Sequence, residues 1–82
     1  MRKYETYIKN DKGRYIFLGW YPMKNEEFVI DTKERTKQVK DWVDGKWVSV
    51  HKTFIYKTYK YLNGSTEVLK YGSYIEEVKE NV

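Results

Sequence analysis

The chain lacks cysteine altogether and has only one histidine and one proline among its 82 residues. Without cysteine no disulfide forms, and without a cysteine–histidine cluster no structural zinc site is expected. No apolar run approaches the ~18 residues of a membrane-spanning helix. No apolar segment follows the charged start Met1–Glu5, so no signal peptide is expected. We therefore expect a soluble, cytoplasmic protein with no membrane partner and a single domain over residues 1–82.

Aromatic residues are abundant, at 18% of the chain, with nine tyrosines, three tryptophans and three phenylalanines. Each such ring removes roughly 150–250 Å² from water when it is buried. A domain of this length has a thin core. Its stability must therefore come from aromatic packing or from association with another copy or a partner.

Three turn signals divide the chain, at Asn10–Gly13, at Asp44-Gly45 and at Asn63-Gly64. Asp-Gly and Asn-Gly are strong hairpin signals because both central residues of a type I′ turn need positive φ. The sequence predicts a mainly β fold, a small curved antiparallel sheet or partly closed barrel of five or six strands built from hairpins. The expected strands are Lys3–Lys9, Arg14–Tyr21, Glu27–Thr32, Lys37–Val43, Lys46–Leu62 and Ser65–Tyr71.

Two-residue loops would also fix the register of two hairpins. With Asp44-Gly45 as the loop, Trp42 lies opposite Trp47. With Asn63-Gly64 as the loop, Lys60 lies opposite Glu67, as an attractive cross-strand pair. The same register places Tyr59 opposite Val68 and Tyr56 opposite Tyr71.

Three segments allow alternatives. Lys33–Lys37 has no apolar residue, so we predict a charged loop there rather than part of a helix over Thr32–Val43. Lys46–Leu62 is far longer than a usual strand of ~5–6 residues, which predicts a bend or bulge near His51–Thr53. Ser73–Glu76 fits a capping box and favours a short helix from Tyr74 to about Glu80, with continuation of the last strand as the alternative.

The residues that could carry catalysis are few. The single histidine, His51, lies two residues from Ser49 on a predicted strand, a spacing that gives no evidence of an activated nucleophile. The adjacent acids Glu26-Glu27 point to opposite faces of a strand. No phosphate-binding glycine loop and no metal-ligand spacing is present. We expect a non-enzymatic protein with no catalytic residue, metal or cofactor.

Basic and aromatic side chains alternate in the middle of the chain, where residues 33–60 hold eight basic and three acidic residues. Rings stack on nucleic-acid bases and ammonium groups bind phosphates, so a sheet face with both suits single-stranded nucleic acid or a nucleotide-like anion. The same rings also serve as core residues or protein-interface anchors. The predicted ligand-binding residues are Trp42, Trp47, Lys40, His51, Lys52, Lys57, Tyr59 and Lys60.

Two other functions remain open from the sequence. The small size and the lysine-, tyrosine-, asparagine- and isoleucine-rich composition resemble those of small phage or mobile-element proteins, and that resemblance implies a protein that binds and inhibits a host protein. The thin core and long strands also favour self-association through strand edges, as a homo-oligomer.

Overall fold

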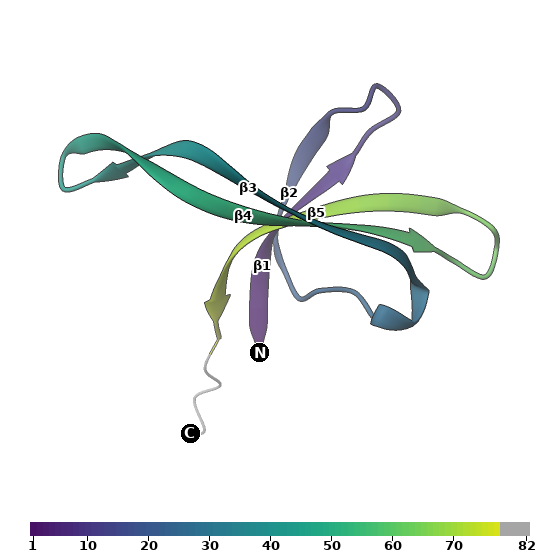
Figure 1. The fold of residues 1–82 in the computed structure, drawn as a ribbon. Coiled ribbons are helices and arrows are strands. Elements are labelled where there is room, and N and C mark those ends of the chain that lie inside the picture. The colour runs from purple at the N-terminus through teal and green to yellow at the C-terminus, as the bar shows by residue number, and fades with distance from the viewer. Residues whose placement is uncertain (78–82) are drawn as a thin grey trace, which may run out of the picture.

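The computed structural model describes residues 1–77 as one open, curved sheet of five antiparallel strands in the order β2-β1-β5-β4-β3 (Figure 1). The prediction of a mainly β fold with a small curved antiparallel sheet is therefore confirmed, and the sheet is not closed because β2 and β3 form separate edges. None of the helices of the described part is long and apolar enough to cross a membrane. The elements are β1 (Arg2–Lys9), β2 (Tyr15–Tyr21), the 3₁₀ turn η1 (Glu26–Phe28), β3 (Val29–Val43), β4 (Lys46–Lys60) and β5 (Thr66–Glu76).

One face of the sheet, here called the core face, holds the buried aromatic cluster. Tyr59, Leu69 and Tyr71 are its fully buried members. The hydroxyl groups of the two tyrosines are hydrogen-bonded to each other at 2.8 Å, which satisfies both polar atoms. Met23 and Phe28, from the segment that joins β2 to β3, pack against this cluster. This segment takes the place of a second layer over part of the core face.

The hairpin at Asp44-Gly45 has the predicted register, with Trp42 opposite Trp47. Asp44 has φ 49° and Gly45 has φ 76°, the two positive angles that a type I′ turn needs. Residues 38–51 of this hairpin pair only with one another, because β5 pairs with β4 only from Ile55 onward. We call residues 38–51 the arm; Figure 1 shows it projecting away from the other strands.

The charged loop predicted at Lys33–Lys37 is wrong. These residues continue β3 and pair with β4, with Arg35 opposite Phe54. An edge strand needs no buried residue, which is why the absence of apolar side chains did not prevent a strand here. Of the bend or bulge predicted near His51–Thr53, the bulge is absent, since the β3–β4 pairing runs without a register shift from Asp31 to Val43. The strand predicted at Glu27–Thr32 begins only at Val29, after η1.

The register predicted for the Asn63-Gly64 hairpin is wrong by one residue. Tyr59 lies opposite Glu67, and Lys60 lies opposite Thr66. The loop has three residues rather than two, because the Tyr61 amide donates to the Ser65 carbonyl at 2.9 Å. Gly64 has φ 85°, which suits the left-handed residue of such a loop.

The same one-residue shift overturns two other expected pairs. Tyr56 faces Lys70 rather than Tyr71, and Thr58 rather than Tyr59 faces Val68. Because successive side chains of a strand point to opposite faces, a shift of one residue changes which side chains share a face. The shift thereby brings Tyr59 and Tyr71 together on the core face.

The predicted C-terminal helix is wrong for its described part, and the alternative, a longer strand, is confirmed. Ser73–Glu76 extends β5, with Tyr74 opposite Tyr4 on β1. Arg2 and Glu76 form an ion pair of 2.6 Å across the same two strands. The side of β1 that does not pair with β2 offers backbone partners, and these outweigh the local capping signal. The rest of the predicted helix, from residue 78 onward, lies outside the described residues.

Candidate functional site

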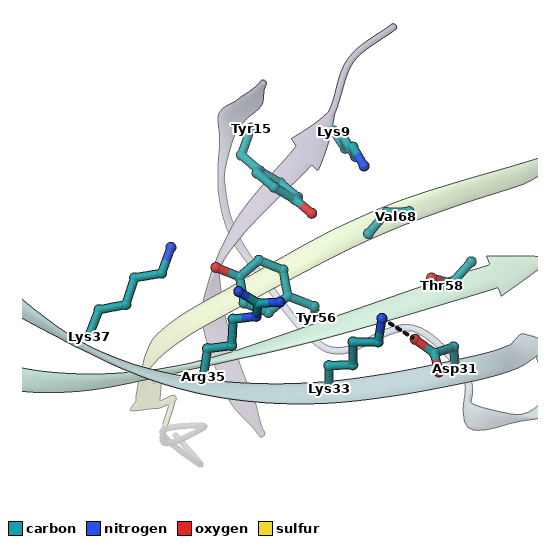
Figure 2. A pocket seen from close by; sticks show the side chains of 9 residues that line it. All are labelled: Lys9, Tyr15, Asp31, Lys33, Arg35, Lys37, Tyr56, Thr58 and Val68. Atoms are coloured by element: carbon teal, nitrogen blue, oxygen red, sulfur yellow. Dashed lines mark ion pairs between the residues drawn. The ribbon is translucent and has the colours of Figure 1, made fainter. Parts of the chain in front are cut away.

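The face opposite the core face contains a cleft of about 380 Å³ (Figure 2). Every strand contributes to it, from Lys9 on β1 and Tyr15 on β2 to Val68 on β5. Since β2 and β3 are opposite edges of the sheet, their joint presence means that the sheet curls toward this face. The lining residues are Lys9, Tyr15, Asp31, Lys33, Arg35, Lys37, Tyr56, Thr58 and Val68.

The cations of the cleft come mainly from β3. Lys33, Arg35 and Lys37 are spaced by two residues, so their side chains leave the strand on the same face. The pairing places Lys33 on β3 opposite Tyr56 on β4. On the same face, toward the β2 edge of the sheet, Lys9 on β1 lies opposite Tyr15 on β2. Figure 2 shows the three side chains rising from the same side of β3, with Arg35 beside Tyr56 and Lys33 directed toward Asp31.

The charge of the cleft is positive. Four of its lining residues are cationic and only Asp31 is anionic. Asp31 pairs with Lys33 at 3.9 Å, the outer limit of an ion pair, and both side chains are more than half exposed. The field of Lys9, Arg35 and Lys37 is therefore left to attract anions.

The ring pair Tyr15–Tyr56 lies inside the cleft, with centroids 5.5 Å apart and planes inclined by 69°. Burial raises the pKa of Tyr15, and Tyr56 raises it further, against the opposing effect of Lys37 and Arg35. The Tyr15 hydroxyl therefore remains protonated at neutral pH and can donate a hydrogen bond.

Further cations lie over rings next to the cleft. The Lys70 Nζ is 4.6 Å from the centroid of Tyr7, 5.3 Å from that of Tyr15 and 4.6 Å from that of Phe54. The Lys37 Nζ is 5.8 Å from the Tyr56 centroid. These distances are within the ~6 Å of a cation–π contact. This face therefore combines basic side chains with aromatic rings. The sequence predicted the same combination, but on other residues.

The predicted tryptophan pair is formed, but it lies on the arm and not at the cleft. Trp42 and Trp47 meet edge to face at 5.1 Å and are 57% and 64% exposed. Lys40 and His51 are exposed on the same side of the arm, with Lys40 opposite Ser49. By strand alternation this is the core-face side of β4, so these four residues do not join the cleft.

The other predicted site residues have different environments. Tyr59 is 0% exposed and belongs to the core, so it presents no ring to a ligand. Lys57 is also buried, pairs with Glu26, and has its pKa lowered by burial. Lys60 is exposed at the end of β4. The observed register puts Leu69 and Tyr71 on the same face as Tyr59, and these residues bury its ring.

Lys52 lies on the cleft face but is already neutralised. Its Nζ donates to Glu5 Oε1 at 2.5 Å, and the Ser73 amide and the Tyr7 hydroxyl donate to the same carboxylate. Burial favours a higher pKa of Glu5, but these hydrogen bonds outweigh it, and the pKa of Glu5 is lowered. Gly72 makes room for this network, because a Cβ there would lie 3.2 Å from Glu5 Oε1.

The cleft residues were missed from the sequence, although part of the signal was present. The alternation of cations at Lys33, Arg35 and Lys37 is the period of a strand with one basic face. It was interpreted as a loop because no apolar residue accompanied it. Tyr15 and Lys9 had no local signal, because only the strand order brings them near β3.

Within residues 1–77, no group of three or more histidine, cysteine, aspartate or glutamate side chains gathers where it could hold a metal ion. Comparison with family models, with curated proteins and with solved structures finds no match for this chain. The chemistry of the cleft is therefore the basis for a functional conclusion.

Proposed function

We propose that this chain is a non-enzymatic binding module that holds single-stranded nucleic acid or a nucleotide-like anion in the cleft. The observation that carries the proposal is the convergence of four cations and two tyrosine rings, from different strands, on one concave face. A positive groove that follows a phosphate backbone, with rings for the bases, is the usual arrangement for single strands.

The roles of the residues follow from their chemistry. Arg35 offers a planar fork of donors that matches a phosphate, whereas Lys33 and Lys37 supply compact charges beside it. Tyr15 and Tyr56 provide rings on which a base can stack. The volume of about 380 Å³ lies within the range of ~300–1,000 Å³ typical of small-ligand sites, so one or two nucleotides fit at a time.

Fluorescence anisotropy with labelled single-stranded DNA and RNA, at ~50 and ~200 mM salt, tests the proposal, because counterion release makes phosphate binding salt-dependent. We expect affinity to fall with salt. The double variant Lys33→Gln/Arg35→Gln should bind roughly tenfold or more weakly, with a slope of log affinity against log salt reduced by about 1.4 for two lost phosphate contacts. The matched control Lys12→Gln/Lys46→Gln removes two exposed cations that do not line the cleft, one in the β1–β2 turn and one at the start of β4, and should retain most of the affinity.

The arm variant Trp42→Ala/Trp47→Ala separates the cleft from the site first predicted. Loss of binding in this variant, with binding kept in Lys33→Gln/Arg35→Gln, would assign the ligand to the arm. Absence of binding by the parent chain at low salt, to oligonucleotides and to mononucleotides alike, would reject the proposal.

A second function, binding and inhibition of a host protein by a phage-type protein, is favoured by one observation. Two exposed tryptophans lie at the end of a projecting arm. Tryptophan is enriched among residues that dominate protein interfaces. For either function we propose a cytoplasmic location, because the chain contains no cysteine.

A further inference from the structure

The two edges of the sheet differ in their protection against pairing with another strand. Seven of the fifteen residues of β3 are charged, and lysine-rich edges discourage association. β2 has the sequence YIFLGWY, without a charged residue. A strand edge presents unpaired backbone amides and carbonyls to any strand that can approach it. Of the two edges, only β2 lacks a charged barrier.

The side chains of β2 are apolar on both faces of the sheet. Ile16 lies opposite Ile8 on the core face, and Phe17 lies opposite Tyr7 on the cleft face. The five large apolar residues of this strand are each between 41% and 52% exposed. Apolar side chains that are half exposed on both faces of the sheet are typical of an edge strand that has no neighbouring strand on its outer side. These residues are Ile16, Phe17, Leu18, Trp20 and Tyr21.

A mostly apolar hollow of about 400 Å³ lies on the core face beside β2. Leu18 and Tyr21 form its outer wall, and Leu69 and Tyr71 form its inner wall. The segment that joins β2 to β3 reaches the hollow only through Pro22 and Lys24. A hydrophobic sheet face in a folded domain is normally covered by another layer or by a neighbour.

We propose that two copies of this chain form a dimer by antiparallel pairing of their β2 strands about a two-fold axis normal to the sheet. Such an axis places the same strand of both copies side by side and continues one sheet through both. Apolar residues then meet apolar residues on both faces. The charged β3 edges of the two copies lie at the opposite ends of the joined sheet, which limits repulsion between two chains of net charge +4.

The area available is near the threshold for a stable dimer. Aromatic side chains bury roughly 150–250 Å² each, so the three half-exposed rings of β2 leave on the order of 300 Å² of apolar surface per copy, and Ile16 and Leu18 bring the total to on the order of 500 Å². Two copies would bury on the order of 1,000 Å² of side-chain surface, and the backbone edge adds to that total. Stable interfaces begin at about 1,200 Å². The dimer should therefore be reversible and depend on concentration.

The bulge of β2 shapes the interface but does not prevent it. The pairing with β1 shifts between Thr6 and Tyr7, which leaves Leu18 as the extra residue of β2. Bulges bend an edge and interrupt its hydrogen-bonding pattern. Backbone pairing in the dimer is therefore limited to the residues on either side of Leu18, and side-chain packing supplies most of the stability.

Sedimentation velocity over ~5 to ~500 µM, a range that suits an interface near the lower size limit, measures the dimer directly. We expect the parent chain to shift from monomer to dimer within this range. Ile16→Lys should remain monomeric throughout. The matched control Ile30→Lys makes the same substitution at an exposed residue of the β3 edge, 62% exposed in the structure, and should dimerise as the parent does.

Circular dichroism of each variant checks that it folds, and Trp20→Lys replaces Ile16→Lys if that variant does not. A parent chain that stays monomeric throughout, a folded β2 variant that dimerises like the parent, or loss of the dimer in Ile30→Lys alone would each overturn the proposal. The measurement uses no ligand, so its outcome is independent of anion binding in the cleft.

Discussion

The hydroxyl groups of Tyr59 and Tyr71 are the most deeply buried polar pair described in the core. Each residue is 0% exposed, and their oxygens are 2.8 Å apart. Burial, followed by the hydrogen bond with Tyr71, raises the pKa of Tyr59 well above its usual range, so this hydroxyl stays neutral. Tyr71 also accepts a bond from the Lys24 amide at 3.4 Å, which ties the connecting segment to the core.

Tyr59→Phe should lower the free energy of unfolding by about 1–2 kcal/mol, because the ring remains but the buried Tyr71 hydroxyl loses its best partner. Urea denaturation measures this change. Tyr74→Phe, at a half-exposed residue of β5, is the matched control and should change stability by less than about 0.5 kcal/mol. Equal stability of Tyr59→Phe and the parent would mean that water replaces the missing hydroxyl.

Among the elements, β4 has two different environments along its length. Between Ile55 and Tyr59 it has a strand on both sides, whereas in the arm it has only β3. Isolated two-stranded hairpins are marginally stable in water. The arm should therefore open locally without unfolding the sheet.

Amide hydrogen exchange should show this difference within one strand. We expect amides at Val48 and Val50 to exchange at least about tenfold faster than those at Tyr56 and Thr58, because only the latter lie in the multi-stranded part of the sheet. The comparison is internal, so temperature and pH affect both groups alike. Similar protection along all of β4 would indicate that something covers the arm in solution.

At the scale of the whole molecule, two carboxylates connect distant parts of the sheet. Glu5 on β1 binds Lys52 on β4 and the Ser73 amide on β5. Glu67 on β5 binds Lys24 in the connecting segment at 2.5 Å. Burial works against both charges, but their hydrogen bonds outweigh it, and the pKa of each carboxyl is lowered.

The free energy of unfolding should therefore fall as the pH drops below ~4.3, the ordinary pKa of a glutamate, toward the lower folded-state pKa values. In that window the unfolded chain binds more protons than the folded chain, so acid favours unfolding. Urea denaturation at a series of pH values measures the effect. Glu5→Gln should flatten the dependence, whereas Asp11→Asn, in the exposed β1–β2 turn, should leave it unchanged. If the free energy of unfolding of Glu5→Gln fell with pH as steeply as that of the parent, the role given to this carboxylate would be contradicted.

The accuracy of the sequence predictions varied with how far each feature depended on distant residues. Asp44-Gly45 fixed a two-residue turn locally, and the pairing of Trp42 with Trp47 followed correctly. Asn63-Gly64 is compatible with loops of two or three residues, and the wrong choice placed Tyr71 on the opposite face from Tyr59.

The cleft could be predicted only in part. The alternating cations of β3 were visible, but their strand was not recognised because an edge strand can be stable without apolar residues. The approach of Tyr15 to Tyr56 depends on the strand order, which no pair of neighbouring residues specifies.

The sequence by itself determined the class of fold and the kind of surface, because turn residues, strand periodicity and composition act locally or through averages over the chain. It specified β-hairpins that are rich in aromatic and basic side chains. Only the tertiary structure decided which rings are buried, which cations converge and which edge is left unprotected. These features depend on strand order and register, where a shift of one residue exchanges the two faces of a sheet.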